Sequence, residues 1–509
     1  MAELTPMMQK YMETKEQYKD CILFYRLGDF YEMFFDDALV ASKELEITLT
    51  GKSCGLEERA PMCGIPYHAV EGYLSKLVSR GYKVAICEQV EDPKLAKGLV
   101  KREVIRVVTP GTNLNVQSLE AGKNNYLLSI AYTSDGIGIS AADVTTGDYY
   151  VTEVEDLKKL NDELMKYEPS EIICNEAFLV SGFDVNDLRS RLHISVNALE
   201  SHMFDDDGCR RILMKHFKVN TLIGLGVEEF PTGLLAAGAL LQYLYDTQKT
   251  DLEHFTHIYP YLTSKYMLLD SSTRRNLELT ETLREKQKRG SLLWVLDKTK
   301  TAMGARLLRN YIEQPLIEKD EMEKRLDAIQ ELNQDSISRD EIREYLNPIY
   351  DLERLLSKVT YKTANPRDLI AFRNSLQMLP PIKTVLSAFE KEELTEILEQ
   401  IDGLEDIYQL IDEAILEEPP ISIREGGMIK DGFDETIDRL RSAKHDGKQW
   451  LAQLEEEDRE RTGIKNLKIK YNKVFGYYFE VTNSYQDLVP EDYIRKQTLA
   501  NAERYTTPR

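Results

Sequence analysis

Two aromatic-rich apolar runs flank a short turn early in the chain, from Leu23 to Phe35, where the sequence is LFYRLGDFYEMFF. Gly28-Asp29 at its centre is a turn signal, so we predict two short strands joined by a tight turn. Because side chains alternate across a strand, Phe30 and Glu32 are expected to point to one side and Tyr31 to the other. Aromatic clusters usually form a packed core, so a hairpin core is the simplest interpretation of these residues alone.

Between residues 120 and 260 the pattern changes to short β-rich runs and helices. The sequences NNYLLSIAY, GIGISAADV and GDYYVTEV predict strands joined by Ser-Asp-Gly and Thr-Thr-Gly turns, which together form an antiparallel meander. A helix at Asp156–Lys166, a strand at Glu171–Cys174 and a buried helix around Leu234–Leu244 are predicted to follow. We therefore expect an α/β domain here, after a mixed domain at residues 1–115.

From about Tyr261 the chain becomes predominantly helical, and we predict a helical region over residues 261–437. An unusually long helix is predicted at Asp431–Thr462, where apolar residues follow a seven-residue repeat. About 32 residues at a rise of 1.5 Å would form a rod of roughly 48 Å, and Gly463 is a suitable residue to end it. A helix that long must leave the globular body and carry a structure at its tip.

The segment after this helix predicts a hairpin with one charged face. Lys468 and Lys470 alternate with apolar residues, so one face packs and the other is cationic. The turn is expected at Asn472–Gly476 and the returning strand at Tyr477–Val481. We predict that Tyr493–Pro508 is helical, so that residues 438–500 form the tip and residues 501–509 begin a returning helix.

Composition and charge change this picture in one respect. The chain has 509 residues, which predicts three or four domains, and its net charge of −22 argues at first against a nucleic-acid partner. The charge is unevenly distributed, however: Glu390–Glu418 carries −11, whereas Arg461–Lys473 has five basic residues and no acidic one. Gly72–Arg106 has eight basic residues against four acidic ones. Such sorting is expected of a protein that touches DNA only at certain places.

The sequence gives only weak evidence for a catalytic site or a metal site. The six cysteines have no regular spacing and are expected to be reduced thiols of a cytoplasmic protein, since the opening residues do not resemble a signal peptide. His254 and His257 lack a third metal ligand. Asp143 at a strand end raises the possibility of a two-metal nuclease, but Asp148 and Glu153 lie on the same hairpin and cannot surround a metal pair alone. Gly51-Lys52-Ser53 lacks the first glycine of a nucleotide-binding loop.

Several long motifs in register resemble the MutS family of bacterial DNA mismatch repair proteins. They are GDFYE at Gly28–Glu32, the segment Pro61–Gln89, VVTPGT at Val107–Thr112, and the helical sequences MLLDSSTRRNLELTETLREK and GSLLWVLDKTKTAMGARLLRNYIEQPL. The resemblance implies a multidomain α/β plus mainly α protein. It would have a mixed α/β mismatch-recognition domain, an RNase H-like connector, a helical core and lever, and a small β-rich clamp at the lever tip.

The resemblance also implies the roles of individual residues. Phe30 would insert into the DNA minor groove and stack on a mispaired base, and Glu32 would hydrogen-bond to that base, while Phe24, Phe34 and Phe35 remain core residues. Further residues implied beside the mispair are Tyr31, Asp29, Met33, Met62 and Gly64, with Met62–Ile65 expected to be a loop. Residues implied at the DNA backbone are Arg106, Lys468, Lys470, Asn472, Lys473, Arg495, Lys496 and Asn501. The alternative for the tip residues is a solvated charged hairpin without a ligand.

Members of the family continue with a C-terminal ATPase domain, for which we find no motif in this sequence. We therefore expect this chain to be an N-terminal part with no catalytic residues, no metal and no cofactor of its own. In the full-length family ATP and magnesium are cofactors, a homodimer forms, and a MutL-type repair protein is a partner. For this chain we expect binding of duplex DNA with mismatches or small loops, in the cytoplasm with the nucleoid, and no membrane contact.

Overall fold

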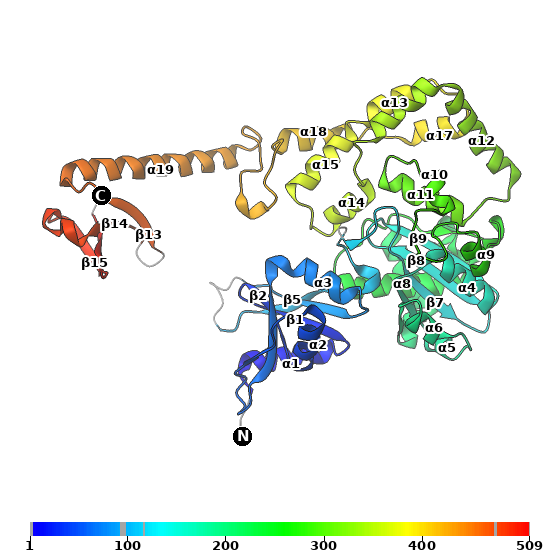
Figure 1. The fold of residues 1–509 in the computed structure, drawn as a ribbon, viewed down its shortest axis with the longest axis horizontal. Coiled ribbons are helices and arrows are strands. Elements are labelled where there is room, and N and C mark those ends of the chain that lie inside the picture. The colour runs from blue at the N-terminus through cyan, green and yellow to red at the C-terminus, as the bar shows by residue number, and fades with distance from the viewer. Residues whose placement is uncertain (1–3, 92–97, 116–117, 473–475, 508–509) are drawn as a thin grey trace. The chain divides into compact units, whose positions relative to one another are not determined.

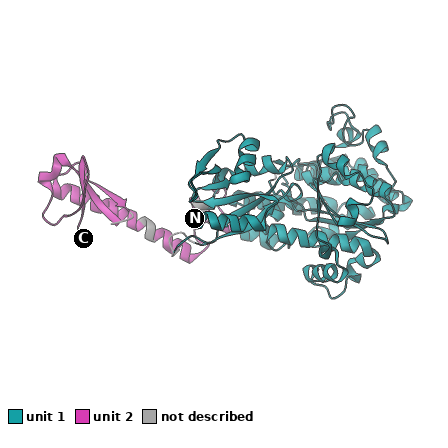
Figure 2. Ribbon diagram, turned by 90° about the horizontal axis from the view of Figure 1, so that it is seen from below, with its two compact units in different colours: residues 1–411, 421–423 teal, residues 412–420, 424–509 magenta. Residues whose placement is uncertain are grey.

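The computed structural model describes residues 4–91, 98–115, 118–472 and 476–507 (Figure 1). Residues 1–411 and 421–423 form one compact unit, unit 1, and residues 412–420 and 424–509 form unit 2 (Figure 2). Among the described residues, no helix is both long and apolar enough to span a membrane. All six cysteines lie in the described part of the chain, where they are buried and unpaired.

The first domain of unit 1 is a mixed sheet with the strand order β3-β4-β2-β1-β5-β6. The strands β1 and β5 are parallel, and the other neighbours are antiparallel. The strands are β1 (Cys21–Leu27), β2 (Phe30–Phe34), β3 (Thr50–Lys52), β4 (Ala60–Pro66), β5 (Lys83–Gln89) and β6 (Arg102–Val108). The helices are α1 (Pro6–Gln17), α2 (Phe35–Leu45) and α3 (Val70–Val78).

Both faces of this first sheet are buried. On one face, Leu23 and Phe34 pack with Met8 and Tyr11 of α1. On the other, Phe24 joins a core formed with α2 and α3. The predicted core positions of Phe24 and Phe34 are confirmed, since both side chains are buried. Phe35, also predicted in the core, is partly buried against the first cluster. A sheet packed on both faces is a rigid support for the residues at its edges.

The second domain contains the predicted meander, β7 (Leu127–Tyr132), β8 (Ile137–Asp143) and β9 (Asp148–Val154). The strand order is β11-β10-β7-β8-β9-β12, in which β10 (Glu171–Cys174) and β11 (Ser195–Ala198) continue the sheet in parallel and β12 (Tyr259–Pro260) pairs with β9. The predicted buried helix is α8 (Pro231–Gln248), which packs on β8 so closely that a Cβ at Gly138 would lie 1.9 Å from the Thr232 carbonyl oxygen. The other α-helices are α4 (Leu157–Tyr167), α5 (Glu176–Leu179), α6 (Val185–Ser190) and α7 (Asp206–Phe217).

The predicted helical region follows and is anchored to the linker before the second domain. The buried Arg306 guanidinium forms a two-bond ion pair with Asp351, with both N–O distances 2.7 Å, and a third bond of 2.6 Å with Glu353. It also donates to the carbonyl oxygen of Ala121 at 2.9 Å. The α-helices are α9 (Ser271–Asn276), α10 (Leu292–Leu296), α11 (Ala302–Glu313), α12 (Lys319–Gln334), α13 (Ser336–Leu346), α14 (Leu352–Thr360), α15 (Pro366–Leu376), α16 (Leu379–Leu386), α17 (Glu392–Gln400) and α18 (Glu405–Ala414).

Unit 2 contains the predicted long helix, α19 (Glu435–Thr462), capped by the Asp434 side chain and ended by Gly463 at φ +72°. Its 28 residues span about 42 Å at 1.5 Å per residue. An antiparallel sheet follows in the order β13-β14-β16-β15, and its core contains Ile464, Leu467 and Val481. The strands are β13 (Lys468–Asn472), β14 (Gly476–Thr482), β15 (Ile494–Thr498) and β16 (Ala502–Thr506).

One prediction for unit 2 is wrong. Residues 493–508 were expected to be helical and residues 501–509 to begin a returning helix, yet the structure forms β15 and β16 there. The segment is rich in helix-forming residues, but β16 pairs with β14, and Tyr493 and Tyr505 pack against Phe479 in a common core. Non-local pairing and burial therefore override local helix propensity.

Candidate nucleic-acid interface

Phe30 is held outside the core by the turn between β1 and β2. Gly28 adopts φ +60°, a left-handed conformation that glycine adopts without strain, and Asp29 is exposed beside it. The Asp29 carbonyl oxygen accepts a hydrogen bond of 3.0 Å from the backbone of Tyr67, which fixes the turn to the end of β4. Phe30 pairs with Pro66, and 48% of its surface is exposed. A large apolar side chain is thus presented to solvent by a rigid sheet.

Glu32 lies on the same side of β2 as Phe30, as the alternation predicts, and its backbone pairs with Gly64 of β4. Gly64 has no side chain to cover this area, and a Cβ there would lie 3.6 Å from Glu32 Cγ and 3.9 Å from Phe30 Cδ1. The Glu32 carboxylate forms an ion pair with the ammonium of Lys52 on β3. The structure therefore brings Phe30, Glu32 and Gly64 together and adds a lysine that the motifs did not indicate.

Tyr31 and Met33 do not lie with them. Both are buried in the opposite face of the sheet, with 5% and 0% of their surfaces exposed. The Tyr31 hydroxyl donates a hydrogen bond to Glu88, to which Arg26 also donates at 3.0 Å. Burial and this carboxylate raise the pKa of Tyr31. The expected side-chain contact of Tyr31 and Met33 with a ligand does not agree with their burial, and both residues support the sheet.

The expected loop at Met62–Ile65 is a strand. The whole segment belongs to β4, which pairs with β2 on one side and β3 on the other. Glycine and proline disfavour strands, which explains the prediction, but neighbours on both sides satisfy the backbone of this segment. Met62 is half-buried and Gly64 is partly exposed, so these two residues contribute to the surface around Glu32.

Arg106, expected at a DNA backbone, is directed inward. Its guanidinium donates a hydrogen bond of 3.0 Å to the carbonyl oxygen of Thr112, and burial lowers the pKa of Arg106. This placement does not agree with the prediction, because the guanidinium is bonded to the protein backbone and is not directed to solvent. Other basic residues of the segment form ion pairs, namely Lys76 with Glu46, Arg80 with Glu44, Lys83 with Asp20 and Lys101 with Glu103.

In unit 2, the register places a charged row across the sheet. Lys468 lies opposite Glu480, which in turn lies opposite Arg504. Glu480 accepts from Lys470 at 2.6 Å and lies 3.7 Å from Arg504, so the carboxylate offsets part of the positive charge of this face. Lys468 is exposed. The sequence prediction missed Arg504 because it placed that residue on a helix, and the sequence AERYT of β16 has no alternation of apolar and polar residues that indicates a strand.

The remaining tip residues are placed differently. Arg495 is exposed and forms an ion pair of 3.1 Å with Glu503, while Lys496 and Asn501 are exposed on β15 and at the following turn. Asn472 ends β13 and is partly exposed. Lys473 lies outside the described residues. The tip thus presents several cations, of which Lys470 and Arg495 are neutralised by carboxylates within the sheet.

The second domain does not bring together the three acidic residues of the nuclease alternative: Asp143 and Asp148 both accept from the Asn124 amide, but Glu153 lies apart from them. Asp143 is fully buried, and its carboxylate accepts hydrogen bonds from Asn124 and from the backbone of Thr145. Glu153 instead caps α8, accepting from the backbone of Thr232 and Gly233. Within the described part of the chain, no group of three or more acidic, histidine or cysteine residues has an arrangement that could hold a metal ion. His254 is buried, with Nε2 3.1 Å from the carbonyl oxygen of Val144.

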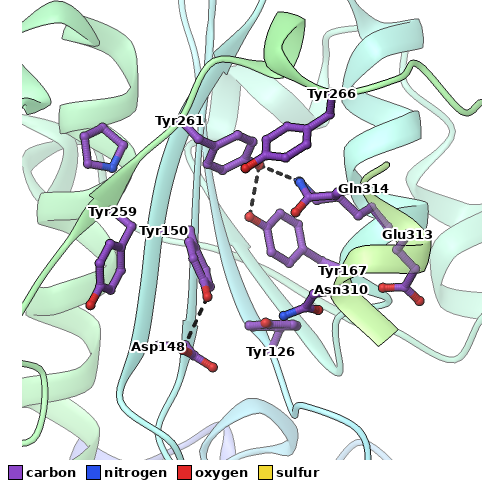
Figure 3. Close-up of a pocket in the computed structure, with 12 residues that line it drawn as sticks. Tyr126, Asp148, Tyr150, Tyr167, Tyr259, Tyr261, Tyr266, Asn310, Glu313 and Gln314 are labelled. Atoms are coloured by element: carbon purple, nitrogen blue, oxygen red, sulfur yellow. Dashed lines mark hydrogen bonds between the residues drawn. The ribbon is translucent and has the colours of Figure 1, made fainter. Parts of the chain in front are cut away.

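Unit 1 also contains a tyrosine-rich pocket of about 420 Å³, drawn in Figure 3. The Tyr167 hydroxyl donates to the Tyr261 hydroxyl at 2.9 Å, and the Lys166 ammonium lies 4.3 Å from the centre of the Tyr261 ring. Burial raises the pKa of Asp148 to about 6 and that of Glu313, at the end of α11, to about 7. The pocket is lined by residues of the second domain and of the end of α11, and Asp148 is the one that sequence singled out, in the nuclease alternative.

Comparison with known proteins is consistent with this architecture. Residues 5–117 match MutS domain I, residues 125–256 match MutS domain II, and residues 272–501 match MutS domain III. Proteins named DNA mismatch repair protein MutS from Lachnoclostridium phytofermentans, Ruminiclostridium cellulolyticum and Acetivibrio thermocellus are 68%, 54% and 53% identical over the whole chain. The chain covers 54%, 58% and 58% of these relatives, so it spans about half of their length. The chain therefore belongs to the MutS family of DNA mismatch repair proteins.

Proposed function

We propose that this chain binds duplex DNA at mispaired or unpaired bases, the step that initiates mismatch repair. The observation that carries the proposal is the exposure of Phe30, on a strand whose other aromatic residues, Tyr31 and Phe34, are buried. An apolar side chain inserted at a base step unstacks it at a cost of a few kcal/mol, and this cost is lowest where pairing is already poor. Glu32, on the same side of the strand, is positioned to hydrogen-bond the displaced base.

The sheet of unit 2 is proposed to hold the DNA backbone. Phosphate contacts give affinity without sequence preference, whereas contacts to the bases give specificity. Exposed Lys468, Lys496 and Asn501 can donate to phosphate oxygens without breaking an ion pair described above. Lys470 and Arg495 would first have to leave Glu480 and Glu503. In this proposal unit 1 supplies discrimination and unit 2 supplies general affinity.

Further features follow from membership of the family and are part of the same proposal. The second domain is the RNase H-like connector, and the long helix is the lever that carries the clamp. The chain itself is proposed to bind DNA without acting as an enzyme. ATP and magnesium, a homodimer and a MutL-type partner belong to the full-length protein, acting in the cytoplasm with the nucleoid.

The test is a comparison of affinities for two labelled duplexes that differ at one base pair. One contains a G·T mispair and the other is fully matched, and binding of the purified chain is followed by fluorescence anisotropy. A preference for the mispaired duplex supports the proposal, and equal affinities refute it. Magnesium is then added to the same mixtures, and cleavage of either duplex would instead indicate an enzyme.

A further inference from the structure

Lys52 reaches Glu32 from two strands away. It ends β3, where its backbone pairs with Ala60, while Glu32 pairs with Gly64 on the opposite side of β4. The Lys52 side chain extends back over the sheet, with its ammonium 5.5 Å from the centre of the Phe34 ring, and meets the Glu32 carboxylate. Gly64, beside Glu32, has no side chain, and a Cβ there would lie 3.6 Å from Glu32 Cγ.

This ion pair is partly shielded from water. Glu32 and Lys52 expose 17% and 33% of their side chains, whereas Phe30 on the same strand face is half-exposed. Screening by water and salt is weaker for partly buried pairs than for exposed ones. The carboxylate is therefore both fixed in position and neutralised beside the exposed aromatic ring.

We propose that Lys52 is a positioning residue for mismatch discrimination, holding the Glu32 carboxylate beside Phe30 and offsetting its charge near DNA. The inference rests on the proposed function. An unpaired carboxylate would be repelled by the phosphates on both sides of a groove, and its side chain would be free to leave the base edge. Lys52 removes both effects, so its contribution to discrimination passes through Glu32.

This role predicts a specific pattern in a double-mutant cycle. In the wild-type background, Lys52→Met is expected to lower the mismatch-to-match affinity ratio by roughly three- to tenfold, a typical coupling for residues in direct contact. In a Glu32→Gln background the same substitution should change the ratio less than about twofold, because the carboxylate that Lys52 holds is absent. Lys52→Arg keeps the cation and should retain most of the wild-type ratio.

The alternative is that Lys52 contacts a phosphate and acts independently of Glu32. Lys52→Met would then weaken binding of both duplexes equally, in both backgrounds, and would flatten the log–log salt dependence by about 0.9. A purely structural role would lower the unfolding temperature without this dependence on Glu32. The matched control is Lys76→Met, since Lys76 is also paired with a glutamate, Glu46, and is similarly exposed at 38%.

The experiment measures anisotropy titrations of G·T and matched duplexes with wild type, Lys52→Met, Glu32→Gln, the double variant, Lys52→Arg and Lys76→Met. Thermal unfolding of each variant verifies its folding. Three results together support the inference. Lys52→Met lowers the mismatch-to-match affinity ratio in the wild-type background, it has little effect on that ratio in the Glu32→Gln background, and Lys52→Arg retains most of the wild-type ratio. An unchanged ratio, or equal changes in both backgrounds, overturns it while the proposed function stands. A wild-type chain without mismatch preference overturns both.

Discussion

Phe30 and Tyr31 are neighbours in the chain, but they lie on opposite sides of β2. Phe30 is half-exposed beside Gly64, whereas Tyr31 is buried and its hydroxyl is bonded to Glu88. A strand directs successive side chains to opposite faces. Of these two adjacent aromatic residues, one is therefore available to a ligand and the other supports the sheet. The distinction gives the first prediction.

Phe30→Ala is expected to abolish the preference for mispaired duplex while leaving folding intact, because the side chain makes little contact with the core. Anisotropy titrations and thermal unfolding measure the two effects. The matched control is Phe34→Ala, at a buried position on the same strand face, which should destabilise the domain by about 3–5 kcal/mol. A Phe30→Ala chain that kept full discrimination, or that unfolded, would show that Phe30 is a core residue.

Glu480→Gln is expected to strengthen DNA binding without changing the mismatch-to-match ratio. The substitution releases Lys470 and Arg504 from their common carboxylate, so up to two more cations can meet phosphates, each steepening the log–log salt slope by about 0.9. Titrations across about 50–200 mM salt measure the slope.

Lys468→Gln should have the reverse effect and flatten that slope by about 0.9. Lys319→Gln, at an exposed lysine of α12, is the charge-matched control. It should alter neither the salt slope nor the mismatch-to-match ratio. A changed mismatch ratio with an unchanged slope would place the charged face of β13 and β14 away from the DNA backbone.

Glu313 should contribute stability to unit 1 that falls as pH rises from about 4.5 to 7. Burial raises the pKa of Glu313 to about 7, above the usual value of 4.5, although Arg309 at 3.5 Å acts in the opposite direction. The folded state therefore retains a proton that the unfolded chain releases. The stabilisation is fully present below about pH 4.5 and is lost as pH passes 7, a change of roughly 1–3 kcal/mol.

Glu313→Gln should reduce this pH dependence, because the amide cannot ionise. Unfolding temperatures of wild type and variant between pH 5 and 8, in about half-unit steps, provide the comparison. Identical pH profiles would mean that Glu313 ionises freely in the folded protein.

Arg306→Met should be strongly destabilising, by about 3–5 kcal/mol, because it removes the buried guanidinium that pairs with both Asp351 and Glu353. Denaturant unfolding measures the loss. Arg339→Met removes an exposed ion pair with Asp340 on α13 and is expected to change stability by less than about 1 kcal/mol. Similar losses in both variants would contradict an anchoring role for Arg306.

Local pattern was sufficient to predict β1, β2, the meander and α19, because each has a clear period or a turn signal at its ends, and α8, because it contains a long apolar run. It also placed Phe30 and Glu32 on one face. What could not be predicted depends on residues distant in sequence. Lys52 meets Glu32 only because β3 and β2 flank β4, and β16 forms because its backbone pairs with β14. The inward direction of the Arg106 guanidinium, by contrast, involves a nearby turn, whose Thr112 carbonyl oxygen accepts its hydrogen bond.

The first sheet, packed on both faces, has a mechanical consequence for recognition. A side chain mounted on so stiff a support cannot adapt to the duplex, so the nucleic acid must deform around it. Insertion of Phe30 therefore depends on the local deformability of the DNA duplex, not on the identity of a particular base. Lesions that loosen stacking without any mispair, such as a missing base, should therefore engage Phe30 as readily as a G·T pair does.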